Sequence, residues 1–569
     1  MDPELREWIE RRFSVPEPRS NKVTTIRHAI AEHVRPRDTI HLGMTHARGS
    51  VGFFELVRRF AGTDPGFTLC AVQMTSVLAP LVHSGLARKI VTSWAGDSYR
   101  TPGPNGVYQR AWSDGLPFEH WSILTFVQRL AAGARGHGVA ATRSLVGSTM
   151  ADENDVRVLD DGTALIPALV PDVSIFHAPA ADAAGNVLFS PPLFENVYGA
   201  LAARRGAIVT VDRVVDTEII REHAHMTLLP SSRVLAVVEA PMGAHPGGLL
   251  PTGIGGVQGY AEDYDFWVQM REAARDPSAM EAWVKEWIVE TESHGRYLEM
   301  LGRDRIDELK GRTARDPLVD LRAAMPDLDA PPTEIERAIC TAARTLGDRI
   351  KSERYTAMLA GAGNANLAAW LAAYDLAEDG IGIDLVAEMG LVGYWPRPGE
   401  PILFNQRNFP TCTMLADIDR TLSIVIGGPQ ARSIGALGAA QIDKAGNINS
   451  TLVPGEYLLM GSGGANDVVT CATESVVIAA QSKDRFVERV PYVTGPGERV
   501  RAVISTGGVF EKDQGELILT GIYDDDVEPV REQCGWDLRV AGNLQRLDPP
   551  NDSEIRALRL MDPQGWFRT

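Results

Sequence analysis

The chain has 569 residues, of which 44% are hydrophobic and 23% are charged. Because a single hydrophobic core stops growing at roughly 250 to 300 residues, we expect two large lobes. The 74 Asp and Glu residues outnumber the 56 Lys and Arg residues, which gives a formal charge of -18. This charge, spread along the chain without a basic block, argues against nucleic acid or an anionic membrane as a partner. It leaves room for an anionic small ligand bound by backbone amides and one or two basic side chains.

The five cysteines are odd in number and scattered along the chain. Such a set predicts neither a disulfide framework nor a zinc knuckle, and we expect no metal. The N-terminal stretch from Met1 to Phe13 is charged, and the sequence contains no run of about 18 apolar residues. We therefore expect a cytoplasmic protein without a membrane segment.

Short runs rich in Val and Ile alternate with stretches rich in Ala and Leu along most of the chain, for example at Ala207 to Val211 and at Arg501 to Ser505. This alternation is typical of an α/β fold with largely parallel sheets. Between about residues 259 and 309 the pattern changes, and aromatic residues recur at helical spacing from Tyr264 to Tyr297. That segment is predicted to be a helical excursion from the first lobe, with the aromatic stripe buried.

A proline-rich segment marks the boundary between the lobes. Residues Met325 to Thr333 contain three prolines, which discourage both helix and central strand. Thr333 and Glu336 then have the spacing of a capping box, which predicts the start of a new helix. We therefore divide the chain into residues 1–328 and 329–569.

The two lobes carry an internal echo. Asp182 to Val187 reads DAAGNV and Asp443 to Ile448 reads DKAGNI. A strand, a glycine loop and a helix are also predicted early in each lobe, at Thr39 to Phe60 and at Ala357 to Ala373. The lobes are therefore expected to be two related open α/β units that differ by insertions.

Two motifs in the second lobe combine an apolar strand with a polar turn. A glycine turn follows the apolar run that ends at Ala360 and leads into a helix at Asn364, an arrangement that exposes backbone N–H groups. Glu388 comes 24 residues after Asn364, at the end of another apolar run and before Gly390. A strand end would project this carboxylate toward a loop-lined cleft.

A third motif, Gly461 to Asp467, places small residues where a backbone can approach a ligand closely. Backbone amides at two glycine turns could together form an oxyanion hole. Each motif taken alone is more often an ordinary turn, and Glu388 taken alone is more often a structural carboxylate. The order of the three motifs along the chain is what carries information.

This order resembles the class I coenzyme A transferases, in particular the glutaconate-type branch with its related alpha and beta subunits. The first lobe resembles the alpha subunit through Pro171 to Ala178, Ala181 to Val187 and the helical excursion. The second resembles the beta subunit through Ala357 to Gly363, Ala387 to Gly390, Leu437 to Asp443, Gly446 to Thr451 and Gly461 to Asp467. The resemblance covers nearly the whole chain and implies the CoA-transferase fold, with both subunits fused.

The resemblance implies that Glu388 is a nucleophile that attacks an acyl-CoA thioester and passes through a glutamyl-CoA thioester in a ping-pong exchange between two carboxylic acids. It implies CoA as substrate, no permanent cofactor and a homodimer. Glu388 at the ordinary Glu pKa of about 4.3 would be ionised at neutral pH without any shift. The site residues implied are the backbone amides of Asn364 and Gly463 as oxyanion donors, and Gly361, Gly363, Gly390, Gly461 and Gly464 as lining of the CoA and substrate site.

Two features depart from the family pattern. The loop from His41 to Gly49 lacks a Gly-Gly-Phe-Gly run, and Met389 follows the nucleophile where Ser or Asn is common. The acyl group is therefore left open. Two alternatives also remain: a hydrolase of acyl-CoA or carbocyclic CoA esters on the same scaffold, in which water replaces the second acid, and a ligand-binding sensor of sugar phosphates.

Other polar residues have simpler interpretations. We interpret His177 as a core histidine and the pair His223 and His225 as a loop pair rather than metal ligands. The role of His245, in a glycine-rich loop, is left open. Asp467 is expected to brace its glycine turn rather than to contact substrate.

Overall fold

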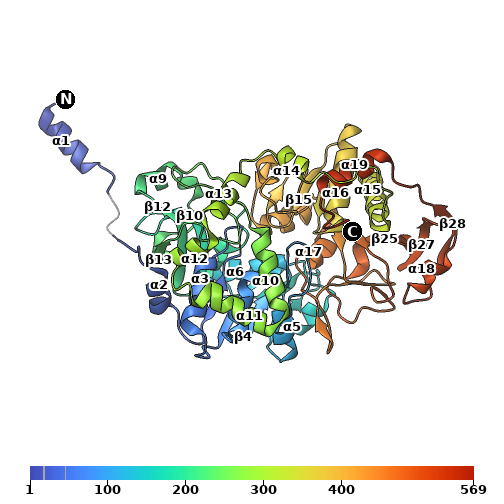
Figure 1. Ribbon diagram of the computed structural model, residues 1–569, viewed down its shortest axis with the longest axis horizontal. Helices are drawn as coiled ribbons and strands as arrows, with labels where there is room; N and C mark the ends of the chain where they lie inside the picture. The colour runs from blue at the N-terminus through green and yellow to red at the C-terminus, as the bar shows by residue number, and fades with distance from the viewer. Residues whose placement is uncertain (17–19, 45, 569) are drawn as a thin grey trace.

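The structure is a computed structural model that describes residues 1–16, 20–44 and 46–568. Two large sheets form the body, one from the N-terminal half of the chain and one from the C-terminal half (Figure 1). The α/β class and the largely parallel sheets are as predicted. The boundary proposed at residues 328 and 329 falls between helices α14 (Pro317–Ala323) and α15 (Glu334–Glu353).

The first sheet has the strand order β13-β12-β10-β1-β2-β4-β6, and every neighbouring pair in that order is parallel. All nine residues of the central strand β10 are buried, as expected for a parallel strand covered on both faces. Short β11 (Val187–Leu188) pairs antiparallel with β10. The strands are β1 (Thr39–Leu42), β2 (Phe67–Cys70), β4 (Ala87–Thr92), β6 (Phe118–His120), β10 (Val173–Ala181), β12 (Gly206–Val214) and β13 (Val234–Glu239).

Helices connect these strands and cover the sheet. The predicted strand, loop and helix unit near the start of the chain is present as β1 and α3. Helix α6 begins with a capping box in which Ser122 and Thr125 satisfy each other's backbone N–H groups. The helices are α2 (Ile26–His33), α3 (Ser50–Phe60), α4 (Ala79–His83), α5 (Gly106–Ser113), α6 (Ile123–Ala134), α7 (Thr149–Glu153), α8 (Asn196–Ala202) and α9 (Thr217–Glu222).

The helical excursion is present and is longer than predicted. Its helices begin at Tyr264 and continue to Ala323 rather than ending near residue 309, because two short charged helices follow the aromatic ones. The aromatic stripe is buried as expected. The ring centroid of Trp283 lies 5.8 Å from that of Phe266 and 6.3 Å from that of Phe54 in α3. The helices are α10 (Tyr264–Arg275), α11 (Pro277–Val284) with a π turn (Lys285–Val289), α12 (His294–Leu301), α13 (Arg303–Arg312) and α14 (Pro317–Ala323).

The second sheet has a parallel core, β15-β14-β18-β23-β25, and antiparallel pairs extend it at both sides before β28 closes one edge parallel to β27. Its first helix, α15 (Glu334–Glu353), starts with the predicted capping box of Thr333 and Glu336. The strands are β14 (Ala357–Ala360), β15 (Asp384–Ala387), β16 (Leu391–Val392), β17 (Met414–Leu415), β18 (Ser433–Gly438), β23 (Glu474–Ala479), β25 (Val500–Ser505), β26 (Gly508–Asp513), β27 (Glu516–Ile522) and β28 (Val540–Arg546), and the other main helices are α16 (Asn364–Glu378), α17 (Ala465–Cys471), α18 (Glu528–Glu532) and α19 (Asp552–Met561).

The internal echo corresponds to the same turn in both lobes. In the first lobe Oδ1 of Asp182 accepts the N–H groups of Ala184 and Asn186. In the second, Oδ1 of Asp443 accepts the N–H groups two and four residues later, at 3.0 Å each. In both, the Asn side chain donates back to the other Asp oxygen. This shared hydrogen-bond pattern shows why the sequence repeats Asp and Asn at these positions.

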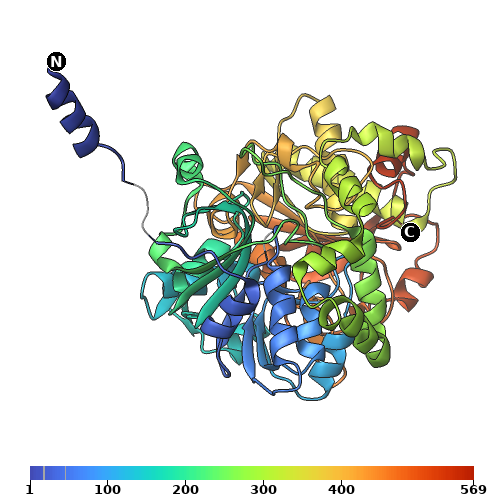
Figure 2. The same ribbon diagram turned by 60° about the vertical axis from the view of Figure 1, so that its left-hand side comes forward.

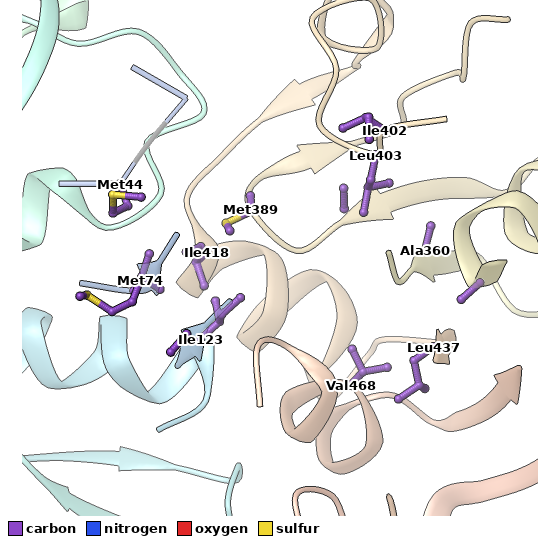
Figure 3. Packing of buried hydrophobic residues seen from close by; sticks show 14 of the residues in the cluster. Met44, Met74, Ile123, Ala360, Met389, Ile402, Leu403, Ile418, Leu437 and Val468 are labelled. Carbon is purple, nitrogen blue, oxygen red and sulfur yellow. The ribbon is translucent and has the colours of Figure 1, made fainter. Parts of the chain in front are cut away.

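One hydrophobic core runs across both lobes. Met44, Met74 and Ile123 of the first lobe belong to the same buried cluster as Met389 and Ile418 of the second (Figure 3). Polar contacts join the lobes as well: the N–H of Ala95 donates to the carbonyl oxygen of Met460 at 2.6 Å, and the hydroxyl of Tyr492 donates to Glu153 at 2.8 Å. The lobes therefore pack as one body.

Helix α1 (Pro3–Arg12) extends away from the body in both views and has no buried residue (Figures 1 and 2). Among the helices of the described ranges, none is both long enough and apolar enough to cross a membrane.

Candidate active site

Glu388 lies at the carboxyl end of β15, where the sequence predicted a projecting carboxylate. The three residues before it and Met389 after it are buried, while Glu388 itself remains partly exposed. A tight turn follows, in which the N–H of Gly390 donates to the carbonyl oxygen of Ala387 at 3.0 Å. Gly390 has φ of 120°, a conformation that glycine adopts without steric cost. The turn therefore fixes Glu388 at the strand end, where part of the residue stays exposed although its carboxylate is desolvated.

The glycine turn before α17 holds the Glu388 carboxylate. The N–H of Gly464 forms a hydrogen bond to this carboxylate. A Cβ atom at Gly464 would lie 1.8 Å from Oε2 of Glu388, which is far inside any permitted contact distance. Gly464 is therefore required for close approach and not for its backbone angles, which are ordinary at φ -86° and ψ 0°.

The ionisation of Glu388 differs from the expectation of an ordinary pKa. Burial of the carboxylate raises its pKa to about 7, and the negative charge of Asp467 acts in the same direction. The hydrogen bond from Gly464 favours the charged form and opposes both effects. The sequence could not show this shift, because it depends on the apolar core around Met389 and on a carboxylate brought in from α17. Glu388 is then fully ionised only above neutral pH.

The first lobe anchors the same glycine turn. The N–H of Gly463 donates to the carbonyl oxygen of Ser93 at 2.9 Å, and the carbonyl oxygen of Gly463 accepts the N–H of Ile123 at 3.0 Å. Gly461 packs against Ser93 so closely that a Cβ would lie 2.3 Å from its carbonyl oxygen. The family resemblance implied the Gly463 amide as an oxyanion donor. In this structure that amide is bonded to Ser93, and the amide that contacts Glu388 is the next one, Gly464.

The other glycine turn lies on the neighbouring strand. Strands β14 and β15 are parallel neighbours, with Leu359 opposite Val386, so the loops that follow them share one edge of the sheet. Gly363 has φ of 84° and caps α16, which places Asn364 at the first position of that helix. N–H groups in a first helical turn have no partner within the helix and can bind an anion. Gly361 packs against β18, where a Cβ would lie 2.7 Å from the carbonyl oxygen of Ala436.

A segment of the first lobe that sequence analysis did not select supports the Glu388 turn from behind. A Cβ at Gly390 would lie 3.0 Å from Cβ of Pro192 and 2.3 Å from the carbonyl oxygen of Ala416. The N–H of Leu193 donates to that same oxygen at 3.1 Å. The Pro-Pro pair at residues 191 and 192 was the available sequence signal, since it marks a rigid extended segment.

The histidines outside this site have structural surroundings. His177 is buried between Thr210 and Asp212, with both ring nitrogens 2.9 Å from their partners, as expected for a core histidine. His245 is held by Asp263 at 3.0 Å and by the hydroxyl of Tyr297 at 2.5 Å. The cavity beside His245 has a volume of about 10 Å³, which admits at most one water molecule. His245 is thus part of the contact between the excursion and the first lobe.

His223 and His225 lie at the end of α9 and in the following turn, as expected for a loop pair. Over residues 1–16, 20–44 and 46–568, no group of three or more His, Cys, Asp and Glu side chains is arranged to hold a metal ion.

Comparisons with known proteins agree with this fold. A model of the coenzyme A transferase family matches residues 23–240 and 429–513, which together are more than half of the chain. The chain belongs to the coenzyme A transferase family. It is accordingly an enzyme of the CoA-transferase class, with CoA as a substrate. The family model does not extend over Glu388, whose role rests on the geometry described above.

Relatives match each lobe. The 3-oxoadipate CoA-transferase of Pseudomonas knackmussii is similar to this chain through both of its subunits. One is 30% identical over 292 residues, covering 48% of this chain and 96% of its own length. The other is 32% identical over 152 residues, covering 23% of this chain and 58% of its own length. A glutaconate CoA-transferase polypeptide from Acidaminococcus fermentans is 28% identical over 318 residues, covering 51% of this chain and 95% of its own length. The chain thus spans parts similar to both subunits of these enzymes.

The whole fold also has a solved counterpart. An acyl-CoA transferase from E. coli O157:H7, YdiF, solved as a thioester complex with CoA, superposes with a TM-score of 0.65. The match covers 96% of this chain and 98% of YdiF at 14% sequence identity. The two lobes together therefore have the fold of a complete CoA-transferase chain.

Proposed function

We propose that this protein transfers CoA between two carboxylic acids through a glutamyl-CoA thioester on Glu388. The observation that carries the proposal is the position of this carboxylate: Glu388 is partly exposed at a strand end, its carboxylate is bonded by the Gly464 amide, and its neighbours Ala387 and Met389 are buried. A carboxylate held by a backbone amide at a glycine turn is suited to nucleophilic attack on a thioester. A hydrolase function is not favoured, because the similar proteins are CoA-transferases.

In the first half-reaction, an oxygen of ionised Glu388 attacks the thioester carbonyl carbon. The carbon–sulfur bond breaks and CoA leaves as a thiolate, so that an acyl-glutamyl anhydride remains on the enzyme. The thiolate then attacks the glutamyl carbonyl carbon of this anhydride. The first acid leaves as a carboxylate, and CoA stays bound to Glu388 as a thioester.

In the second half-reaction, the carboxylate of another acid attacks the glutamyl thioester. CoA thiolate leaves, and a new anhydride forms. The thiolate attacks the acyl carbonyl of this second acid, which releases the new acyl-CoA and returns Glu388 as a carboxylate. The thioester bond energy is conserved throughout, and no external energy source enters the balance.

The donors at the two glycine turns have separate tasks in this scheme. The Glu388 oxygen bound by Gly464 becomes the carbonyl oxygen of the anhydride, and then an oxyanion when the thiolate attacks the glutamyl carbon. We assign the backbone amide of Asn364 to the oxyanion on the substrate acyl carbon, because it begins a helix at the same sheet edge. Donors fixed in advance in this way lower a barrier by about 2.7 to 4 kcal/mol each.

The apolar surroundings of Glu388 serve the transfer by limiting water. Met389, next to Glu388 in the chain, is 1% exposed, and Ile123 of α6, whose N–H donates to the carbonyl oxygen of Gly463, is fully buried (Figure 3). An anhydride or thioester in such surroundings is protected from hydrolysis until the second acid arrives. The resemblance also leads us to propose a homodimer, for which light scattering should give twice the 61.8 kDa mass of one chain.

The experiment that tests the proposal is intact mass spectrometry after incubation with a panel of acyl-CoA esters, with and without borohydride reduction. We expect an adduct of the mass of CoA, located on the peptide that contains Glu388 and discharged by a carboxylic acid to give a new acyl-CoA. Glu388→Ala should form no adduct. Release of free CoA at a rate that is indifferent to added acids would contradict transfer and indicate hydrolysis instead.

A further inference from the structure

Asp467 is a buried carboxylate for which the reaction scheme has so far no use. It is 0% exposed and lies in the first turn of α17. Its Oδ2 accepts the N–H of Leu124 at 3.0 Å, and Leu124 belongs to the first turn of α6 in the other lobe. Burying an ionisable group costs free energy, and a neutral hydrogen-bond acceptor could hold the Leu124 N–H without that cost.

The position of Asp467 relative to Glu388 follows from the helix. Gly464 caps α17 and Asp467 is its third residue, and residues at these two positions lie next to each other around the first turn. The amide that holds Glu388 and the carboxylate of Asp467 therefore occupy the same end of one short helix. Asp467 is close enough to Glu388 for its negative charge to raise the pKa of that carboxylate.

A second side chain of the same turn also contacts the first lobe. Oδ1 of Asn466 accepts the N–H of Leu145 at 2.9 Å, and its Nδ2 donates to the carbonyl oxygen of Thr494 at 2.9 Å. Both neighbours in the sequence, Asn466 and Asp467, thus fix the first turn of α17 to first-lobe backbone. The position of the Gly464 amide is set by these contacts and by the Gly463 bonds to Ser93 and Ile123.

The charged groups near α17 do not neutralise Asp467. On elements packed against this helix, Arg420 is exposed and Glu474 is paired with Arg349. Arg499 donates to the carbonyl oxygens of Cys471 and Ala472, at the opposite end of α17. Other titratable groups on these elements are Arg129 of α6, which is paired with Glu119, Glu498 near that far end, Cys471 on α17 itself, Asp419 beside Arg420 and exposed Arg143 in the loop before Leu145.

We propose that Asp467 is a positioning residue for the nucleophile, which fixes the Gly464 turn to α6 through Leu124 and opposes the carboxylate form of Glu388 with its own charge. This inference rests on the proposed role of Glu388. Its consequence follows from charge alone: the anhydride and the glutamyl-CoA thioester are neutral at Glu388, so the repulsion ends when Glu388 is acylated. Asp467 therefore favours the acylated enzyme over the free carboxylate.

The ionisation of the pair is consistent with this arrangement. Burial raises the pKa of Asp467 to about 7, and Asp467 adds to the raised pKa of Glu388. Two interacting carboxylates release their protons in two steps that belong to the pair. The repulsion is therefore fully present only at alkaline pH, where both groups are ionised.

Asp467→Asn tests the inference, because the amide oxygen can still accept the Leu124 N–H while the charge is removed. We expect the acid limb of the pH profile of kcat/KM to move to lower pH by about one unit. At pH ~8.5 the ratio of CoA adduct to free enzyme should fall about tenfold for each unit by which the pKa of Glu388 falls. Asp562→Asn is the matched control: Asp562 is also fully buried, but it accepts the N–H groups of Trp566 and Phe567 near the C-terminus. The acid limb of kcat/KM for Asp562→Asn should stay at the wild-type pH.

An acid limb that stays in place in Asp467→Asn, with kcat lowered, would overturn the inference and leave Asp467 with a purely structural role. A limb that moves to higher pH would overturn it as well. Should Asn prevent folding, Asp467→Ser, which is neutral and smaller, replaces it with the same expected shift. Failure of the proposed function is distinguishable, because wild-type protein would then form no adduct on Glu388 at all.

Discussion

Replacing Gly464 with alanine separates the position of the nucleophile from the stability of the fold. Alanine readily adopts the backbone angles of Gly464, φ -86° and ψ 0°, so the change brings no backbone strain. The new Cβ would lie 1.8 Å from Oε2 of Glu388, whereas real Cβ atoms keep at least 3.0 Å from other heavy atoms. The carboxylate, as the far end of a flexible side chain, must therefore move.

The required displacement exceeds about 1 Å, and misplacements of that size cost about 10²-fold in rate. We expect kcat of Gly464→Ala to fall by about 10²-fold, which corresponds to about 2.7 kcal/mol of barrier. Circular dichroism and the melting temperature should stay near wild type. The assay is acyl exchange followed by chromatography of the acyl-CoA products.

The matched control is Gly382→Ala, in the same lobe, where an added Cβ meets nothing within 4 Å. This variant should retain wild-type kcat. Retention of more than about a tenth of wild-type kcat by Gly464→Ala, in a correctly folded protein, would refute the placement of Gly464 against the nucleophile, because a displaced carboxylate cannot sustain that rate.

Two further changes test the electrostatics and the contact between the lobes. The pKa of Glu388 in the folded protein is raised to about 7. The contribution of this group to the free energy of unfolding is therefore fully present at low pH and is lost as pH rises through about 7. Glu388→Gln lacks this group and its pH-dependent loss. The melting temperature of Glu388→Gln minus that of wild type should therefore be larger at pH ~8 than at pH ~5, and the same difference at both pH values would contradict the raised pKa. Asn466→Ala leaves the buried N–H of Leu145 and the carbonyl of Thr494 without their partner. We expect the free energy of unfolding of Asn466→Ala, measured in urea, to fall by about 2 to 4 kcal/mol. The control Asn543→Ala, at an exposed position, should show no measurable change. Equal stabilities of the two variants would contradict the role of Asn466.

Local sequence signals predicted the elements that depend on neighbouring residues. The capping box at Thr333 and Glu336 forms through contacts within four residues, so its pattern was sufficient. The repeated sequence at Asp182 and Asp443 indicated related lobes, and the structure adds the turn that both repeats form. The aromatic spacing from Tyr264 likewise indicated a buried helical face. The end of α13 and helix α14, which lie beyond residue 309, were missed because charged residues interrupt the apolar periodicity there.

The details of the site depend on contacts that are distant in the sequence. Which of two adjacent glycine amides faces Glu388 is decided by Ser93 and Ile123 of the first lobe, which engage Gly463 and leave Gly464 to the carboxylate. Similarly, the raised pKa of Glu388 requires burial by the shared core and the approach of Asp467. A motif identifies the residues of such a turn, but the three-dimensional packing assigns their separate tasks.

Transfer of an oxygen atom from substrate to Glu388 tests the central claim most directly. In the proposed scheme the second acid attacks the glutamyl thioester, and one of its carboxylate oxygens remains on Glu388 when the new acyl-CoA leaves. We therefore predict that turnover with an ¹⁸O-labelled carboxylic acid places ¹⁸O in the peptide that contains Glu388, as measured by mass spectrometry. Acyl exchange that proceeds with no label in this peptide would contradict Glu388 as the nucleophile.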